Sequence, residues 1–409
     1  MAARRLSTTE QHFFARYLAA LEAAGIPCLI LRNYDEFPES IGNDLDLFVP
    51  RGDLTRAVDL FRETLRTGGG RLFLSNPRDY VFDLRFSMDG TVASVLELDL
   101  FHGAFTWHGQ PYLESGKLLG DAVKCPNGFR VPRPAHEALN LVLVSLLWGG
   151  FFKERYRARI VERLSTSEER EELERCVDWA FGCKLGFDPC APVSPSKDEV
   201  KAAAVRLRRA LMKRSFERDG TKAMARWARH WLAELGTVFR PLGMHIAILG
   251  PDGSGKSAAI ARARERLGKL FVDTHVHHWR PSILPDLGVL FRKRKRHEGP
   301  VKDPHGQTPH SRPVSLFRLL YYSLDYWLGY FAQIWKRKAQ THLVLFDRYA
   351  ADMWCDPRRY RLALPDPLLR WVASLAPQPD FTFVLLADAE VLQRRKGELP
   401  PEQIGAILA

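Results

Sequence analysis

Apolar positions in the first part of the chain switch between helical and strand spacing. Between Thr8 and Ala24 they recur every three or four residues, which is typical of an amphipathic helix. Threonines at its start can cap the helix N-terminus. Short apolar runs then predict strands, and a second helix is expected to begin near Asp53. Residues 1–130 are therefore expected to form a small mixed α/β domain. Its predicted strands are Cys28–Leu31, Leu45–Val49, Val81–Phe86 and Val92–Phe101.

The pattern becomes helical after Pro134, so residues 131–240 are expected to form a helical middle region. The proline- and serine-rich stretch Ala191–Lys197 interrupts it. The most apolar stretch, Ala138–Trp148, is too short to cross a bilayer, so we expect no transmembrane segment and a cytoplasmic protein. The predicted helical segments are Leu139–Trp148, Glu168–Trp179 and a basic one at Val200–Trp231.

A third region begins where Pro241 and Gly243 precede the apolar run Met244–Leu249. That run predicts a buried strand, because it is short, rich in β-formers and bounded by turn residues. We place the main domain boundary between Gly236 and Gly243 and the third domain at residues 241–409.

A GxxxxGKS pattern follows the predicted strand directly and precedes the helix-compatible run Ala258–Leu267. In this context glycines let backbone N–H groups curl around phosphates, and the N-terminus of the following helix favours the negative charge. Lys256 would reach the β- and γ-phosphates and Ser257 would hold Mg²⁺, so ATP and Mg²⁺ are the expected ligands. The predicted nucleotide-binding residues are Gly250, Asp252, Gly253, Ser254, Gly255, Lys256 and Ser257.

A second apolar run, in the sequence HLVLFDRY, predicts a buried parallel strand that ends at Asp347. A carboxylate there can serve the Mg²⁺ shell, directly or through water. Arg348 would then be aimed at the phosphates, and the alternative for this arginine is a structural ion pair.

These motifs together resemble those of the thymidylate kinase-like P-loop kinases, over roughly Met244–Leu399. Asp252 matches the acidic residue of that family's loop, and Asp347–Tyr349 resembles its DRY motif. The sequence DPRRY resembles a stretch of kinase-like proteins from bacterial surface-polysaccharide clusters. The resemblance implies a parallel sheet with flanking helices, phosphoryl transfer, and Asp252 and Arg348 as acceptor contacts. It also implies a LID whose Arg394, Arg395 and Lys396 close over the phosphate, with Arg395 as a catalytic residue.

Two departures from that family change the expectation. HVHHWRP follows a predicted strand at Leu270–Thr274, where thymidylate kinases carry an REPG-like segment, so the acceptor is expected not to be thymidylate. Arg280 is placed to hold an anionic small molecule or sugar, with His277, His278 and Trp279 shaping its pocket. The sequence also stops before the rest of the LID and the last strand and helix, so we expect the domain to lack its C-terminal end.

Acidic residues alternate in the N-terminal domain. Asp44 and Asp46 lie two apart on one predicted strand and share a face, and Asp99 lies on a later strand with Glu97 as a substitute. Three converging carboxylates can hold Mg²⁺. The region Thr9–Phe101 resembles the nucleotidyltransferase superfamily, without its GS turn. That resemblance implies nucleotidyl transfer. The sequence LRNYDEFPESIGN stands in place of the turn, and its Arg32 is a candidate triphosphate contact. The alternative is a retained fold with solvated acids.

Composition narrows the choice of partners. The net charge of +12 includes the basic run Phe291–Arg296 and the stretch Arg206–Arg229, which favours anionic partners and is compatible with peripheral contact with an anionic membrane. No nucleic-acid motif accompanies these residues, so nucleic acid is not expected as a partner. The spacing of Cys176, Cys183 and Cys190 lacks the CxxC pairs of structural zinc sites, so we expect reduced packing residues.

Three functions follow as hypotheses. The first is a P-loop kinase with a nucleotidyltransferase-like N-terminal domain, and the second makes the N-terminal acids the active site. The third is a non-catalytic nucleotide-binding protein. The sequence does not identify the acceptor or the oligomeric state.

Overall fold

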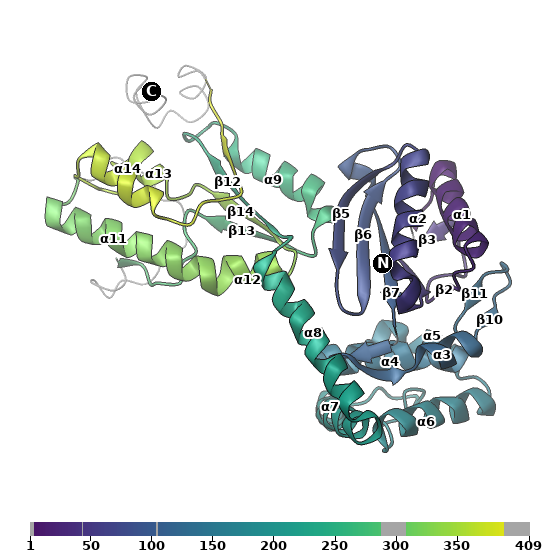
Figure 1. Cartoon of the computed structure of the whole chain (residues 1–409). Coiled ribbons are helices and arrows are strands. Elements are labelled where there is room, and N and C mark those ends of the chain that lie inside the picture. Colours follow the sequence, from purple (N-terminus) through teal and green to yellow (C-terminus); the bar gives the residue numbers. More distant parts are fainter. Residues whose placement is uncertain (1–3, 43, 104, 288–307, 388–409) are drawn as a thin grey trace. The chain divides into compact units, whose positions relative to one another are not determined.

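The computed structural model describes residues 4–42, 44–103, 105–287 and 308–387. The chain divides into two compact units, Met1–Leu235 and Gly236–Ala409, which are described one at a time (Figure 1). The region predicted as 1–130 and most of the region predicted as 131–240 thus fall within a single unit.

The first unit is built on a five-stranded mixed sheet with the order β2-β4-β7-β6-β5. β4 and β7 run parallel, whereas the other neighbouring pairs run antiparallel. The strand at β5 was missed by the sequence analysis, because its polar ends hide the short apolar run. The strands are β2 (Leu29–Ile30), β4 (Asp44–Val49), β5 (Arg71–Pro77), β6 (Val81–Ser87) and β7 (Leu96–His102).

Two helices, α1 (Thr8–Ala23) and α2 (Leu54–Thr67), cover this sheet. Ser7 and Glu10 form a capping box at the start of α1, which satisfies backbone N–H groups that the helix leaves free. Phe61 of α2 makes edge-to-face contacts with Phe13 of α1 and Phe86 of β6. These contacts fix both helices on the sheet.

The helical part of the same unit has its own core around α4, α6 and α7. The predicted basic helical segment Val200–Trp231 forms parts of two helices, because Gly220 adopts a positive φ and separates them. The helices are α3 (Ser115–Gly120), α4 (Pro134–Gly149), α5 (Arg157–Arg163), α6 (Ser167–Phe181), α7 (Lys197–Asp219) and α8 (Thr221–Phe239). Three two-stranded ribbons complete the unit: β1 (Arg4–Arg5) with β3 (Ser40–Ile41), β8 (Phe105–Trp107) with β9 (Gln110–Leu113), and β10 (Val123–Lys124) with β11 (Arg130–Val131).

In its described residues the second unit contains a four-stranded sheet that is parallel throughout, with the order β13-β14-β12-β15. Alternate residues of the central strands enter two cores. On one face Val344 and Phe346 pack with α11 and α14, and on the other Ile246 and Ile248 pack with α9 (Figure 1). The strands are β12 (Met244–Leu249), β13 (Thr274–His278), β14 (Leu343–Asp347) and β15 (Phe381–Val384). The helices are α9 (Lys256–Leu267), α11 (Arg312–Gly329), α12 (Trp335–Ala339), α13 (Asp352–Cys355) and α14 (Asp366–Ser374).

The strand predicted at Leu270–Thr274 is misplaced. Leu270 ends a 3-10 turn, and the histidine-rich segment after it forms β13, paired in parallel with β14. Because β13 is an outer strand of the described sheet, its side chains are half-buried or exposed and need no apolar alternation. Backbone hydrogen bonds to β14, and not an apolar sequence pattern, determine the position of this strand.

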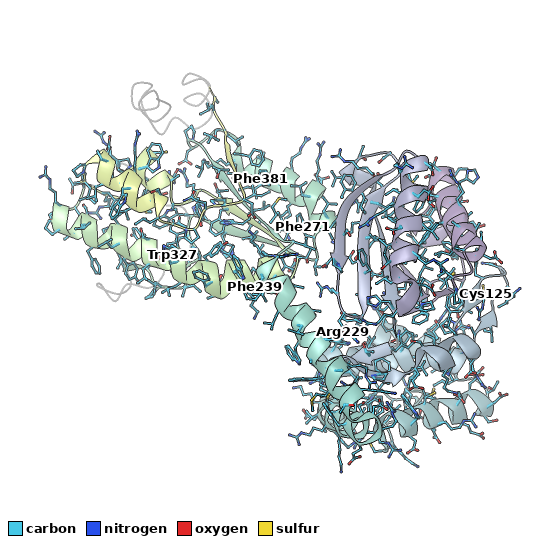
Figure 2. The ribbon with its side chains drawn as sticks, viewed as in Figure 1. Cys125, Arg229, Phe239, Phe271, Trp327 and Phe381 are labelled. Carbon is cyan, nitrogen blue, oxygen red and sulfur yellow. The ribbon has the colours of Figure 1, made fainter. Side chains whose placement is uncertain are left out.

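The aromatic-rich helix α11 is apolar on two faces. Leu319, Tyr322 and Tyr326 are buried in the core, whereas Leu324 and Trp327 are exposed (Figure 2). No helix among the described residues is long and apolar enough to cross a membrane. All six cysteines are described and none forms a disulfide.

Candidate functional site

The loop Gly250–Gly255 connects the end of β12 to the start of α9 at Lys256. Gly250, Gly253 and Gly255 all have positive φ, at 144°, 87° and 95°. A Cβ on Gly250 would lie 2.5 Å from the carbonyl oxygen of Leu385, so a side chain cannot fit there. The glycines therefore permit the turn that brings the backbone of the loop to the N-terminus of α9.

Lys256 is buried and folds back over this loop. Its Nζ donates to the carbonyl oxygens of Gly250 and Pro251, each at 2.8 Å, and lies 3.4 Å from Asp252 Oδ1. Burial lowers the pKa of Lys256, and the charge of Arg348 lowers it further. The ammonium group thus stands inside the loop, where phosphate oxygens would replace the carbonyls as its partners.

Asp347 ends β14, beside both the loop strand and β13. It is in register with Ile248 of β12 and with His278 of β13, whose Nδ1 lies 3.2 Å from Asp347 Oδ2. Burial alone would raise the pKa of Asp347, but His278 and Lys256 outweigh it and hold the pKa below its ordinary value. The carboxylate is therefore ionised near neutral pH.

The residues present fit a magnesium ion. Asp347 Oδ1 is buried and has no hydrogen-bond partner among the described residues, so one carboxylate oxygen is available as a ligand. Ser257 is exposed at the second position of α9, at the open end of the loop. Magnesium binds through few protein oxygens and keeps several waters, which matches one carboxylate and one hydroxyl.

Arg348 lies at the centre of an ion-pair network. Its φ of 75° is unusual for a residue with a side chain, and its guanidinium donates to Asp352 at 2.8 and 3.0 Å and also to Asp252. Arg359 donates to the other oxygen of Asp252 at 2.7 Å. Burial opposes ionisation of Asp252, but Arg348, Arg359 and Lys256 hold its pKa below the ordinary value.

Arg348 is therefore ion-paired with Asp352 and with Asp252 of the loop Gly250–Gly255. Its contact with the phosphates stays a prediction. Arg359 was missed as a site residue. The DPRRY segment was its signal in the sequence, but two adjacent arginines gave no reason to choose one.

Arg280 does not face an open pocket. It is 3% exposed, and its guanidinium donates to Asp325 at 3.1 Å and to Asp286. Asp325, fully buried on α11, also accepts from the backbone N–H groups of Ser282 and Leu284. These contacts favour a structural role for Arg280 over acceptor binding, because its charge is already compensated.

We expect Asp325→Ala to lower the free energy of unfolding by about 3–5 kcal/mol, because it removes the buried partner of Arg280 and leaves that charge only the half-exposed Asp286. Thermal unfolding of the full chain measures the loss. The double variant Arg280→Met with Asp325→Leu removes both charges and should recover most of the stability. A melting temperature of Asp325→Ala equal to that of the wild type contradicts the buried pair.

The other basic residues that the sequence analysis singled out have no described position. Arg394, Arg395 and Lys396, and the basic run Phe291–Arg296, lie outside the described residues. The catalytic role of Arg395 stays a prediction.

The acidic residues of the first unit come together as the strand alternation predicted. β4 and β7 pair in parallel with Asp46 opposite Asp99 and Asp44 opposite Glu97. One carboxylate oxygen from each of Asp44, Asp46 and Asp99 lies within 4.8 Å of the others. Their predicted convergence is confirmed, and the metal itself stays a prediction.

The electrostatics of this cluster are compatible with binding of a cation. Burial raises the pKa of Asp46 to about 6 against the opposing charge of Arg32, and burial together with Asp46 raises the pKa of Asp99 well above its ordinary value. Asp46 Oδ1 and Asp99 Oδ1 are buried without partners among the described residues. Arg32 donates to Asp44 at 2.9 Å and to Asp46, so it compensates the acids from one side.

Comparison with known proteins gives no family assignment. No family model matches the chain, and no curated protein matches it. Among solved structures, thymidylate kinase from Candida albicans is similar at 21% identity, over 41% of this chain and 74% of that one, with a TM-score of 0.29. Thymidylate kinase from Ehrlichia chaffeensis is similar at 20% identity, over 38% and 78%, with a TM-score of 0.25. The description of the fold therefore rests on the strand register given above.

Proposed function

We propose that this chain is an ATP-dependent kinase that transfers phosphate to an anionic small molecule or sugar other than thymidylate. One observation carries the proposal: a glycine-rich loop joins β12 to α9, and Asp347 ends the neighbouring strand in register with Ile248 near the end of β12. A phosphate cradle beside an ionised carboxylate is what Mg²⁺-dependent phosphoryl transfer needs.

Each residue of the site has a task in this reaction. The loop N–H groups and the N-terminus of α9 bind the phosphates, and Lys256 exchanges its carbonyl partners for phosphate oxygens. Bound Mg²⁺ would neutralise charge on the transferring phosphate, with Asp347 and Ser257 as its protein contacts. His278 orients the carboxylate of Asp347 through its hydrogen bond.

The acceptor side of the site is assigned to Asp252 and the two arginines that hold it. The carboxylate of Asp252 can accept a hydrogen bond from a hydroxyl group of the acceptor. Arg348 and Arg359 can bind an anionic group on the same molecule. Trp279 stacks on Tyr360 at 4.6 Å between ring centroids and forms an apolar neighbour for these charges. A hydroxylated anion such as a sugar phosphate combines these features.

We expect no transfer to thymidylate at the roughly 1–100 per second typical of metabolic kinases, because the segment that would bind it is the histidine strand β13. Radiolabelled ATP with a panel of sugar phosphates, lipid-linked sugars and thymidylate tests the proposal. Label should appear in a sugar-containing acceptor. Efficient labelling of thymidylate contradicts the assignment of the acceptor, and labelling of no acceptor leaves the kinase assignment without support.

Nucleotidyl transfer in the first unit is a second candidate function. The convergence of Asp44, Asp46 and Asp99 favours it, since three carboxylates with unpaired buried oxygens can hold the cations of such a reaction. Arg32 is paired with two of them and would have to release them to contact a triphosphate.

A further inference from the structure

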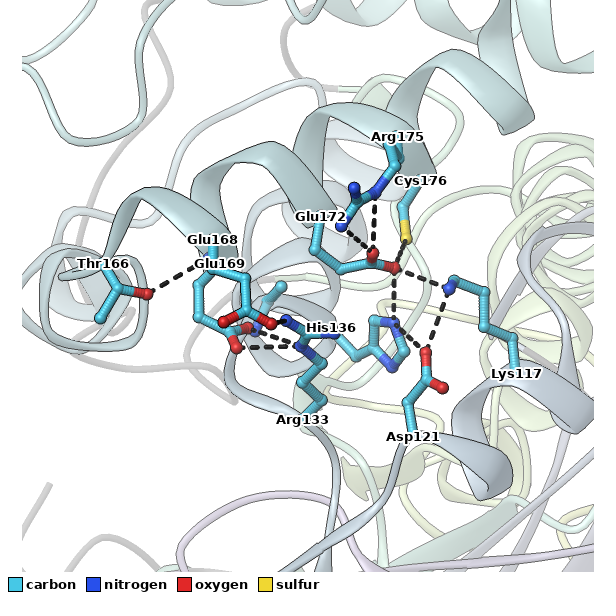
Figure 3. Close-up of polar contacts among 11 residues, drawn as sticks. Lys117, Asp121, Arg133, His136, Thr166, Glu168, Glu169, Glu172, Arg175 and Cys176 are labelled. Atoms are coloured by element: carbon cyan, nitrogen blue, oxygen red, sulfur yellow. Dashed lines mark hydrogen bonds and ion pairs between the residues drawn. The ribbon is translucent and has the colours of Figure 1, made fainter.

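A second group of ligand-type side chains lies among the helices of the first unit, apart from the acids of the sheet. His136 lies in the first turn of α4, and Glu172 and Cys176 lie one turn apart on α6. All three are buried, and one ligand atom from each lies within 4.8 Å of the others. Asp121, which directly follows α3, points to the same spot, as Figure 3 shows.

The separations of these atoms match a tetrahedral zinc site. With metal–ligand distances of about 2.0–2.3 Å, neighbouring ligand atoms of a tetrahedron lie roughly 3.3–3.8 Å apart. His136 Nε2 lies 3.4 Å from Glu172 Oε1 and 3.7 Å from Asp121 Oδ2. Cys176 Sγ lies 3.3 Å from Glu172 Oε1. Two edges among His136, Glu172 and Cys176 and one edge from His136 to Asp121 therefore have the required length. Asp121 is not within 4.8 Å of both Glu172 and Cys176, so it has to move closer to complete a tetrahedron.

The ammonium group of Lys117 lies at the edge of this cluster. Lys117 Nζ lies 2.7 Å from Glu172 Oε1 and 3.0 Å from Asp121 Oδ2 (Figure 3). Its side chain is 43% exposed, so it can withdraw into solvent at small cost. The other oxygen of Glu172 is held by Arg175, which keeps Oε1 turned toward the histidine and the thiol.

The cluster also has a route of entry. A cavity of about 280 Å³ reaches it, with both Lys117 and Cys176 in its wall. A buried site needs such a route to take up a metal ion from solvent. Here Lys117, which would move away, and Cys176, which would bind the metal, line the same cavity.

We propose that His136, Glu172 and Cys176 bind Zn²⁺, and that Asp121 becomes the fourth ligand when Lys117, which lies between Glu172 and Asp121, withdraws. Binding forms bonds from the metal to Nε2, Sγ and two carboxylate oxygens, and the thiol proton passes to solvent. The mixed nitrogen, sulfur and oxygen ligands select zinc over magnesium, which prefers oxygen alone. The metal ties α4 to α6 and to the end of α3.

The ion-pair network of Lys117 is the competing explanation, and cobalt(II) separates the two. A thiolate bound to cobalt gives a charge-transfer absorption band that carboxylates and imidazoles do not give. The half-exposed group Asp273, His275 and His342 of the second unit therefore cannot produce that band, although it has metal ligands.

Cobalt(II) titrated into the full chain should give a saturable thiolate band that zinc abolishes and an excess of magnesium leaves unchanged. Cys176→Ser and Cys176→Ala should lose the band, whereas Cys183→Ser, a matched cysteine outside the cluster, should keep it. Lys117→Met should bind cobalt at least several-fold more tightly, because the competing ammonium is gone. Circular dichroism of each variant checks that it is folded.

Three results would overturn the proposal. They are a wild-type protein without the band, a folded Cys176 variant that retains it, and a Lys117→Met protein that binds cobalt no more tightly than the wild type. Each of them leaves the lysine ion pair as the whole explanation of the cluster.

Discussion

Replacing Lys256 by alanine is expected to lower kcat/KM for phosphate transfer from ATP by about 10²- to 10³-fold. This is the usual effect of removing one preorganised hydrogen-bond donor that stabilises negative charge in the transition state. The ammonium is already held in the loop by two carbonyl oxygens, so it needs little reorganisation to meet phosphate. Steady-state kinetics with the acceptor found by the labelling screen measure the effect.

Lys336→Ala is the matched control, because this lysine is exposed on α12 in the same unit. It should leave kcat/KM unchanged. If Lys256→Ala and Lys336→Ala act alike, the loop is not the site of phosphoryl transfer.

Asp44→Asn combined with Asp46→Asn is expected to weaken Mn²⁺ binding to the first unit by at least about 10-fold, a loss seen even for outer-shell partners of metal sites. The substitutions keep the shape of the side chains and remove two of the three converging charges. Mn²⁺ binding to the full chain without nucleotide measures the change, because the loop of the second unit needs the phosphates of a nucleotide to complete a metal site.

Asp59→Asn, exposed on α2, is the control for this pair and should bind Mn²⁺ like the wild type. Equal Mn²⁺ affinity in the double variant and the control would show that these acids do not bind the metal and belong only to the fold. Loss of Mn²⁺ binding without loss of label transfer from ATP would separate this metal from the kinase reaction.

Local patterns predicted the parts of the molecule that depend on local chemistry. The strand Met244–Leu249 was predicted with the bounds that the structure has, because an apolar run followed by a glycine-rich turn permits few conformations. Asp44, Asp46 and Asp99 converge because side chains two apart share a strand face, and the parallel pairing of β4 with β7 preserves that face.

Long-range contacts explain what the sequence could not show. Arg280 lies before a proline in a polar segment, and nothing local reveals that Asp325, on a later helix, compensates its charge. The position of β13 depends on its hydrogen bonds to β14 and not on its histidines. Cys176 was read with the other cysteines of the sequence, whereas its neighbours in space are a histidine and a carboxylate.

Equilibrium titration of the full chain with Mg·ATP tests the central claim most directly, because every proposed step begins with phosphates in the loop Gly250–Gly255. The account predicts saturable binding below the millimolar range and a marked loss of affinity in Lys256→Ala. Absence of saturable binding by the wild type into the millimolar range, or equal affinity in the two proteins, would contradict it.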